Sequence, residues 1–337
     1  MKFGYREICL DHDTGPRHPE TADRLRAIRR GLAKRHGVEY HDGSLADRAA
    51  IEAVHDPNYV EEIEAFCADG GGTWDADTVA VEETWEAALA SAGLARWAAE
   101  EAIDGSDGRQ TPFSICRPPG HHAEFDEAMG FCFFNNAAVA AQWAIDQDDS
   151  VDRAVIFDWD VHHGNGTQDI FYDQDDVFYI SIHERGLFPG TGDVLETGGP
   201  NARKTILNAP LPGGSGDDEY AAVVDELLDP AIERFDPDLF IVSAGFDAHR
   251  HDPISRMRVS TEGYGHMTDR VRTIADRHDA ALAFVLEGGY GLDALAESVG
   301  MVHEVFDGRE PVIPEGDVIS KAQRVIDDVR DAHDLYD

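Results

Sequence analysis

The chain has 337 residues, 42% of them hydrophobic, and its 67 acidic against 28 basic side chains give a formal net charge of −39. This charge argues against nucleic acid as a direct ligand, because basic side chains bind the phosphate backbone. No stretch of about 18 apolar residues predicts a membrane span, and the first residues lack the basic and then apolar pattern of a secretory signal. We therefore expect a soluble, cytoplasmic protein with no membrane partner.

The acidic residues are spread along the whole chain among ordinary apolar segments rather than gathered in a tail. Like charge at this density destabilises a compact state in dilute buffer. In molar salt the Debye length falls to about 3 Å, and the repulsion is then screened. The composition therefore predicts a halophilic protein that folds in a high-salt cytoplasm.

Segments with helical and strand patterns alternate along the chain. In chain order, the periodicity predicts helices over 85–103 and 136–145, strands over 154–157 and 177–182, a helix over 219–235, a strand over 239–246, a helix over 263–275 and a strand over 281–290. Such alternation is typical of a mainly parallel sheet covered by helices on both faces. No linker-like stretch or internal repeat divides the sequence, so residues 1–337 are predicted to form one α/β domain.

Polar side chains follow each predicted strand at the point where the strand ends. They occupy 158–166, 181–183, position 247 and 287–290. Parallel sheets of this class bind ligands beyond the carboxyl ends of their strands. We therefore expect these four segments to meet at one site.

The first of these segments has the composition of a metal site. In an extended strand Asp158, Asp160 and His162 face the same way, and buried carboxylates need a cation or hydrogen-bond donors. The alternative, an exposed acidic loop with incidental histidines, fits poorly with the buried-strand pattern of AVIFDWDV. With Asp247 as a third ligand, one coordination position stays open for water, as in a catalytic site.

Two further features suggest catalysis, although each alone is more typical of a structural role. His121 and His122 stand together on a loop stiffened by two prolines, where paired imidazoles suit acid–base chemistry. Tyr290 follows two glycines after a strand, and its hydroxyl is placed to donate to an oxyanion. The neighbouring metal segment favours the catalytic interpretation of both.

Several motifs in order resemble the histone deacetylase superfamily. They are HDTGPRHPE (12–20), RPPGHHA (117–123), GFCFFNNAA (130–138), DWDVHHGNGTQ (158–168), PGTGD (189–193), SAGFDAH (243–249) and LEGGY (286–290). The phrasing is most similar to the class II and acetylpolyamine amidohydrolase branch. The resemblance implies the arginase/deacetylase fold, an eight-stranded mainly parallel sheet between helices, with a catalytic domain over 1–337.

The resemblance also implies roles for individual residues. Asp160, His162 and Asp247 match the zinc ligands, although Fe²⁺ or Co²⁺ also suits two oxygens and one nitrogen. His122 matches the general base and His121 its electrostatic companion. Tyr290 matches the tyrosine that polarises the scissile carbonyl. Asp158 supports His121, Asn165 stands behind the second histidine, and Asp158 with Ser181 matches a structural K⁺ site.

A second group of residues is expected to bind substrate. Phe131 and Phe188 resemble the aromatic walls of an acyl-lysine tunnel, Gly130 belongs to the same group, and Ile254 resembles an apolar residue at the tunnel mouth. Asp77 or Thr78 is a candidate anchor for the substrate backbone at the rim.

The favoured substrate is acetyl-lysine in a protein or peptide, hydrolysed by a metal-activated water. The first alternative is an acetylpolyamine amidohydrolase, whose substrate needs an acidic residue at the mouth. Candidates for that acid are Glu124, Asp126, Glu127 and Glu184. The second alternative is a non-catalytic acyl-amine binding protein, and ureohydrolases with two manganese ions are a structural competitor. The sequence leaves the oligomeric state open.

Overall fold

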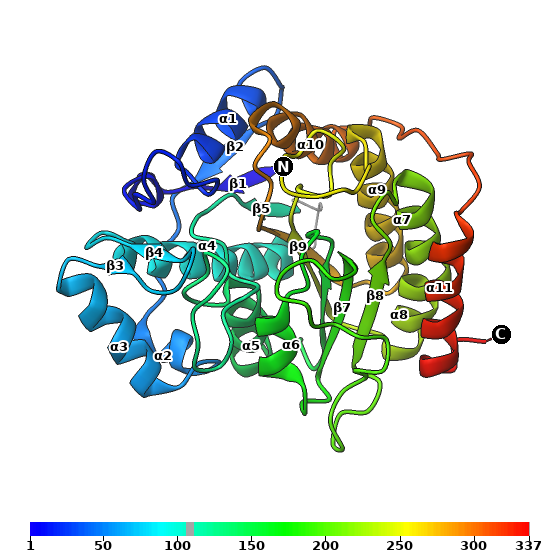
Figure 1. Cartoon of the computed structure of the whole chain (residues 1–337), viewed down its shortest axis with the longest axis horizontal. Coiled ribbons are helices and arrows are strands. Elements are labelled where there is room, and N and C mark those ends of the chain that lie inside the picture. Colours follow the sequence, from blue (N-terminus) through cyan, green and yellow to red (C-terminus); the bar gives the residue numbers. More distant parts are fainter. Residues whose placement is uncertain (106–110, 337) are drawn as a thin grey trace.

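The computed structural model describes residues 1–105 and 111–336, and its centre is an eight-stranded, all-parallel sheet. The strands lie in the order β2-β1-β5-β10-β9-β6-β7-β8 (Figure 1). Their bounds are β1 Lys2–Gly4, β2 Glu39–His41, β5 Pro112–Ser114, β6 Ala154–Asp158, β7 Val177–Glu184, β8 Ile206–Leu211, β9 Leu239–Ala244 and β10 Ala281–Leu286. A separate antiparallel pair joins β3 (Gly72–Thr73) to β4 (Val79–Ala80). The predicted single α/β domain is confirmed.

Helices cover both faces of this sheet (Figure 1). One face carries α1 Asp23–Leu32, α7 Asp217–Val223, α8 Asp229–Phe235, α9 Thr261–Arg277, α10 Leu292–Phe306 and α11 Ser320–His333. The other carries α2 Arg48–Glu52, α3 Pro57–Ala68, α4 Thr84–Asp104, α5 Asn136–Gln147 and α6 Asn165–Phe171. Two short segments complete the list, a 3-10 turn at Glu7–Leu10 and a π-helical turn at Val224–Leu228 between α7 and α8. Within 1–105 and 111–336, no helix has the length and apolarity needed to cross a membrane.

The central strands are apolar throughout because both of their faces are covered. Along β6, Val155 and Phe157 belong to the core under α7 to α11, whereas Ala154 and Ile156 belong to the core under α2 to α5. Alternate side chains of a strand point to opposite faces. Burial on both sides therefore produces the continuous hydrophobic runs that mark these strands in the sequence.

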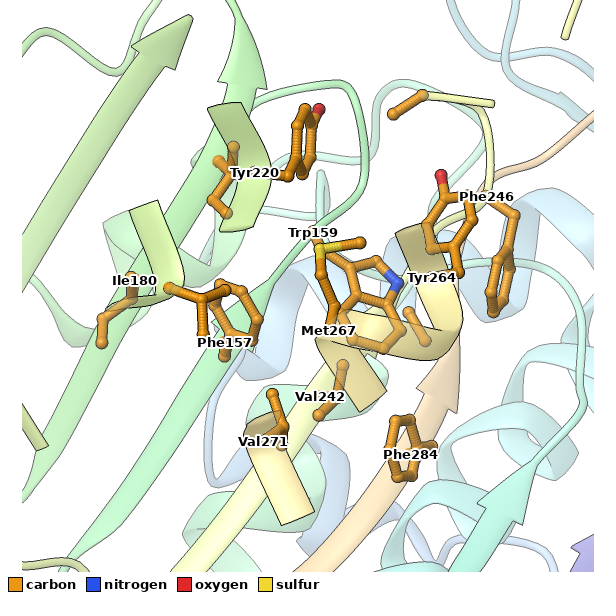
Figure 2. Close-up of a cluster of buried hydrophobic side chains, with 14 of the residues drawn as sticks. Phe157, Trp159, Ile180, Tyr220, Val242, Phe246, Tyr264, Met267, Val271 and Phe284 are labelled. Carbon is orange, nitrogen blue, oxygen red and sulfur yellow. The ribbon is translucent and has the colours of Figure 1, made fainter. Parts of the chain in front are cut away.

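The strands end together at their carboxyl edge. Asp158 at the end of β6 is in register with Ser181 of β7 and Ser243 of β9. The next residue, Trp159, turns into the core and packs against Phe246 and Tyr264 at centroid distances of 6.2 and 5.9 Å (Figure 2). Packing of this large indole fixes the chain where it leaves the strand, between two carboxylates.

Two sequence-based expectations need correction. Asp160 and His162 do not continue the strand, which ends at Asp158, so strand alternation is not what brings them together. They lie in the loop before α6. The periodicity also missed four strands of the sheet: β8, which has six residues, and β1, β2 and β5, which have only three residues each and therefore carry too little pattern to detect.

Candidate active site

Three side chains beyond the strand ends form a group able to hold a metal. One ligand atom each from Asp160, His162 and Asp247 lies within 4.8 Å of the others. Nδ1 of His162 is 3.0 Å from Oδ1 of Asp160 and 3.3 Å from Oδ2 of Asp247. Both aspartates are fully buried. The structure thus brings together the three residues predicted as metal ligands.

The surroundings of this triad fit a cation. Oδ2 of Asp247 is buried without a hydrogen-bond partner, although a buried carboxylate oxygen normally has one. Two glycines make room around the carboxylates: a Cβ at Gly245 would lie 2.0 Å from Oδ2 of Asp160, and one at Gly288 would lie 2.1 Å from Oδ2 of Asp247. The remaining oxygens are held by main-chain donors, from Gly288 to Asp160 at 2.8 Å and from Val161 to Asp247 at 2.8 Å.

The pKa values of the triad also indicate a bound cation. Burial, reinforced by the negative charge of Asp160, raises the pKa of Asp247 to about 7. Burial opposes a charged imidazolium, yet the adjacent carboxylates of Asp160 and Asp247 raise the pKa of His162 to about 10. Two buried carboxylates therefore compete for one positive charge. A divalent cation supplies that charge and leaves the imidazole neutral.

His121 is held by a carboxylate from the end of β6. Its Nδ1 donates to Oδ2 of Asp158 at 2.9 Å, and the hydroxyl of Tyr179 donates to the same oxygen at 3.0 Å. Burial opposes protonation of the ring, but the charges of Asp158 and Asp160 outweigh it and raise the pKa of His121 to about 10. The pairing of His121 with Asp158 matches the supporting contact that the resemblance implies.

His122 has the opposite protonation. Its Nδ1 lies 2.8 Å from Oδ1 of Asn165, whose Nδ2 donates to Glu124 at 2.6 Å. The carboxylate accepts only, so the amide must turn its oxygen toward His122, and Nδ1 must carry the proton. Burial and the neighbouring His121 hold the pKa of His122 well below its ordinary value. The ring is neutral, with Nε2 free to accept a proton.

Glu287, in the loop after β10, hydrogen-bonds both to the segment that carries the paired histidines and to β9. Oε2 of Glu287 accepts from the main-chain nitrogens of Gly120 and His121 at 2.8 and 3.2 Å, and Oε1 accepts from Ser243 at 3.0 Å. Sequence reasoning gave Glu287 no role. A glutamate directly after six apolar strand residues was the available signal, because a buried carboxylate needs donors.

Tyr290 is positioned through its main chain. Oδ2 of Asp252 accepts from the nitrogens of Tyr290 and Gly291 at 2.6 and 2.9 Å. From the other side, the buried Arg24 donates to the carbonyl of Gly289 at 2.7 Å and lies 5.0 Å from the centroid of the tyrosine ring. Neither Asp252 nor Arg24 was identified from the sequence.

The residues predicted to bind substrate lie around this centre. The ring of Phe188 is edge-on to His122 at 5.0 Å, and that of Phe131 is edge-on to Tyr290 at 6.0 Å. A Cβ at Gly130 would lie 2.4 Å from His122 and 2.9 Å from Phe188, so only glycine keeps this space open. Ile254 is half-buried, two residues after Asp252.

The residues predicted to lie at the rim of the tunnel differ in their burial and contacts. Thr78 is buried, and its hydroxyl accepts from the main-chain nitrogen of Phe131 at 3.1 Å, so it holds the wall rather than facing substrate. Asp77 is exposed. Glu184 was a candidate acid at the mouth, but it is buried and paired with Arg256, so that expectation is wrong.

Ser181 lies beside Asp158 in the sheet register, as a shared ion site requires. Its hydroxyl is 2.9 Å from Nδ1 of His183. This adjacency is compatible with the predicted potassium site, which stays a prediction.

Residues 18–306 match the histone deacetylase domain family. The chain is 38% identical over 337 residues to the histone deacetylase-like amidohydrolase of Pseudomonas aeruginosa, covering 90% of this chain and 87% of that protein. It is 33% identical to a probable deacetylase of Archaeoglobus fulgidus, covering 98% of this chain and 97% of that protein. The crystal structure of the HDA15 HD domain has a TM-score of 0.90 and 33% identity, covering 99% of this chain and 96% of that chain.

The α/β fold and these relatives define a hydrolase with deacetylase or amidohydrolase activity. The chain belongs to the histone deacetylase family. The family resemblance seen in the sequence and the predicted eight-stranded fold are therefore confirmed. The branch within the family remains a prediction.

Proposed function

We propose that this protein is a zinc-dependent deacetylase that hydrolyses the acetyl amide of acetyl-lysine in proteins or peptides. The observation that carries the proposal is the meeting of two kinds of residue at one edge of the sheet. A buried triad of Asp160, His162 and Asp247 lies beside His122, and Asn165 keeps the Nε2 of His122 unprotonated. Hydrolysis of an amide by a metal-activated water needs both the metal site and the base.

Zinc held by these three side chains would polarise the amide carbonyl and lower the pKa of the attacking water. Nε2 of His122 takes the proton that the water loses as it attacks the carbonyl carbon. The hydroxyl of Tyr290 donates to the oxygen on which negative charge develops. His122 then returns the proton to the leaving amine, and acetate and the free amine are released.

His121 assists through its charge and its place. Asp158 holds the imidazole ring of His121, and the raised pKa of His121 keeps this ring positively charged near neutral pH. A cation at a ring distance of 4.0 Å keeps the resting His122 neutral. The positive charge of His121 also destabilises the protonated form of His122, so the proton that His122 has taken up is passed on to the leaving amine.

Zinc is the proposed ion because one nitrogen and two oxygens suit a borderline cation with an open position. Fe²⁺ and Co²⁺ accept the same ligands. A structural K⁺ near Asp158 and Ser181 is proposed as well, on the adjacency of the two residues in the sheet.

Acetyl-lysine is favoured over acetylpolyamine as the substrate. Two of the four acidic candidates for holding a distal ammonium are already engaged, Glu184 by Arg256 and Glu124 by Asn165. Phe131 and Phe188 flank the catalytic side chains with apolar rings, which suits the narrow methylene stem of lysine. An acetylated diamine has a methylene stem as well and would also fit between these rings, so the preference rests on the engaged acidic residues.

A competition assay tests this function. Enzyme loaded with zinc in molar potassium chloride is given an acetyl-lysine peptide and an acetylated diamine together, and release of both amines is followed. Preference for the peptide in kcat/KM is expected. Preference for the diamine would favour the polyamine alternative. Tight binding without turnover of either would favour a non-catalytic acyl-amine binding protein.

A further inference from the structure

The loop over 250–258, which follows β9, lines a cavity that is open to solvent. Its volume is about 610 Å³, and it is lined by Arg250, His251, Ser255, Arg256, Met257 and Arg258. This size is in the usual range of ligand sites. The loop is closed at its base by a main-chain hydrogen bond from Arg250 to Val259 of 2.8 Å.

The charge of this cavity is opposite to that of the protein. Three guanidinium groups and an imidazole line it, and none of the lining residues is acidic, in a chain with 67 acidic and 28 basic residues. Arg256 is neutralised by the buried Glu184. Arg250 and Arg258 are exposed, and neither side chain has a hydrogen-bond or ion-pair partner among residues 1–105 and 111–336.

The same loop contacts the catalytic residues directly. The hydroxyl of Ser255 donates to the carbonyl of Asp247, a candidate metal ligand, at 2.6 Å. Asp252 accepts from the main chain of Tyr290, and Ile254 follows two residues later. The basic cavity is therefore built into the loop that orders one side of the active site.

We infer that this cavity binds an acidic side chain next to the acetyl-lysine of the substrate, so that the enzyme prefers acetyl-lysine in acidic segments. The inference rests on the proposed deacetylase function and specifies its substrate class. Guanidinium groups bind carboxylates through paired hydrogen bonds, which ammonium groups cannot match in geometry. If the lysine stem enters beside Ile254, as the family resemblance implies, its peptide backbone would lie at the surface next to the loop that carries Arg250 and Arg258.

A matched pair of peptides tests the preference. Both contain one acetyl-lysine, flanked by two aspartates in the first peptide and by two asparagines in the second, so that charge changes while size does not. We expect kcat/KM to be about 2- to 10-fold higher for the aspartate peptide, since exposed ion pairs contribute modestly. Over the range of potassium chloride in which circular dichroism shows the enzyme folded, the ratio should fall as the salt is raised, because salt screens the pairing.

Variants identify the groups responsible. In the double variant Arg250→Gln, Arg258→Gln the ratio of the two kcat/KM values should fall toward one. The matched control is Arg203→Gln. Arg203 is exposed and lies just before the amino end of β8, whereas the cavity loop follows the carboxyl end of β9, so this variant should keep the parental ratio. Should the double variant fail to fold, the salt dependence of the ratio in the parent enzyme decides instead.

The outcomes separate this inference from the function on which it rests. Equal hydrolysis of the two peptides by the parent, or a ratio unchanged in a folded double variant, overturns the acidic-flank inference alone. A parental ratio that does not respond to salt contradicts it as well. Hydrolysis of neither peptide by the zinc-loaded parent overturns the proposed function, and this inference with it.

Discussion

The side-chain oxygen of Asn165 lies 2.8 Å from Nδ1 of His122, and this contact leaves Nε2 of the ring free of a proton. Burial and His121 keep the pKa of His122 below its ordinary value. The neutral ring is the active form, so activity should fall only as the pH drops through that lowered pKa. Asn165→Asp places a negative charge beside the ring, raises its pKa, and should move the acid limb of kcat/KM to higher pH.

The control for this change is Asn201→Asp, the same substitution in an exposed loop ahead of β8. Its pH profile should match that of the parent. An unchanged acid limb in Asn165→Asp would show that His122 is not the group whose ionisation limits activity.

Tyr290→Phe removes one hydroxyl and leaves the ring in place. We expect turnover to fall about 10²- to 10³-fold, the range for loss of one oxyanion donor, with a smaller change in KM. His122→Ala should lose at least about 10²-fold, since acid–base catalysis contributes about 10²- to 10⁴-fold. Steady-state kinetics on an acetyl-lysine peptide measures both. A variant within about threefold of the parent would exclude that residue from the proposed role.

Asp252→Asn tests the positioning of Tyr290. All three contacts of this carboxylate are main-chain donors, from Tyr290, Gly291 and Ile254. An amide nitrogen turned toward any of them leaves a donor unpaired, at a cost of about 1–3 kcal/mol. Turnover should fall while zinc content is retained. In a double variant with Tyr290→Phe the two losses should not add, because both act through one hydroxyl. Additive losses would assign Asp252 a separate role.

Removal of the metal should abolish activity and lower thermal stability together. Prolonged chelation would withdraw the proposed cation that neutralises Asp160 and Asp247, and an ion that binds only the folded state stabilises it by mass action. Zinc added back should restore both turnover and the melting temperature. Asp247→Asn should weaken zinc binding, as measured by metal content after dialysis. Full activity after chelation would contradict the proposed metal dependence.

Salt should control the stability of the fold. With a net charge of −39, the compact state is destabilised by self-repulsion at low ionic strength. The melting temperature, followed by circular dichroism, should therefore rise steeply between dilute buffer and molar potassium chloride. Sucrose at matched osmolality is the uncharged control and should give a smaller rise. A melting temperature independent of salt would contradict the predicted halophily.

The sequence was sufficient for the central strands and for the residues that converge at their ends. Long apolar runs such as 239–244 predict a strand that is buried on both faces, and the charged residues that follow these runs predict the edge of the sheet where the site lies. It was not sufficient where the determining contact is remote. Glu287 reaches the main chain of Gly120 across 167 positions, and Asp252 reaches Tyr290 across 38. No local pattern encodes such pairings.

The geometry of the metal loop also lay beyond local reasoning. Strand alternation grouped Asp158, Asp160 and His162, but the chain leaves the sheet after Asp158, and of these three only Asp160 and His162 belong to the candidate metal triad. What fixes the loop is tertiary packing of Trp159 against Phe246 and Tyr264. The expected role of Glu184 as an acid at the tunnel mouth was wrong for a similar reason, because its ion-pair partner Arg256 is 72 positions away in the sequence.

The order of strands in the sheet has a consequence for how the chain folds. β10, the last strand to be synthesised, is the only one that pairs with both β5 and β9 among the described residues. Until it emerges from the ribosome, β2, β1 and β5 on one side have no hydrogen-bonded connection to the strands on the other side. The paired histidines follow β5, and the candidate metal ligands follow β6 and β9. The sheet is therefore complete only when β10 inserts, and Tyr290 follows that strand, so chains that end before β10 should carry no hydrolytic activity.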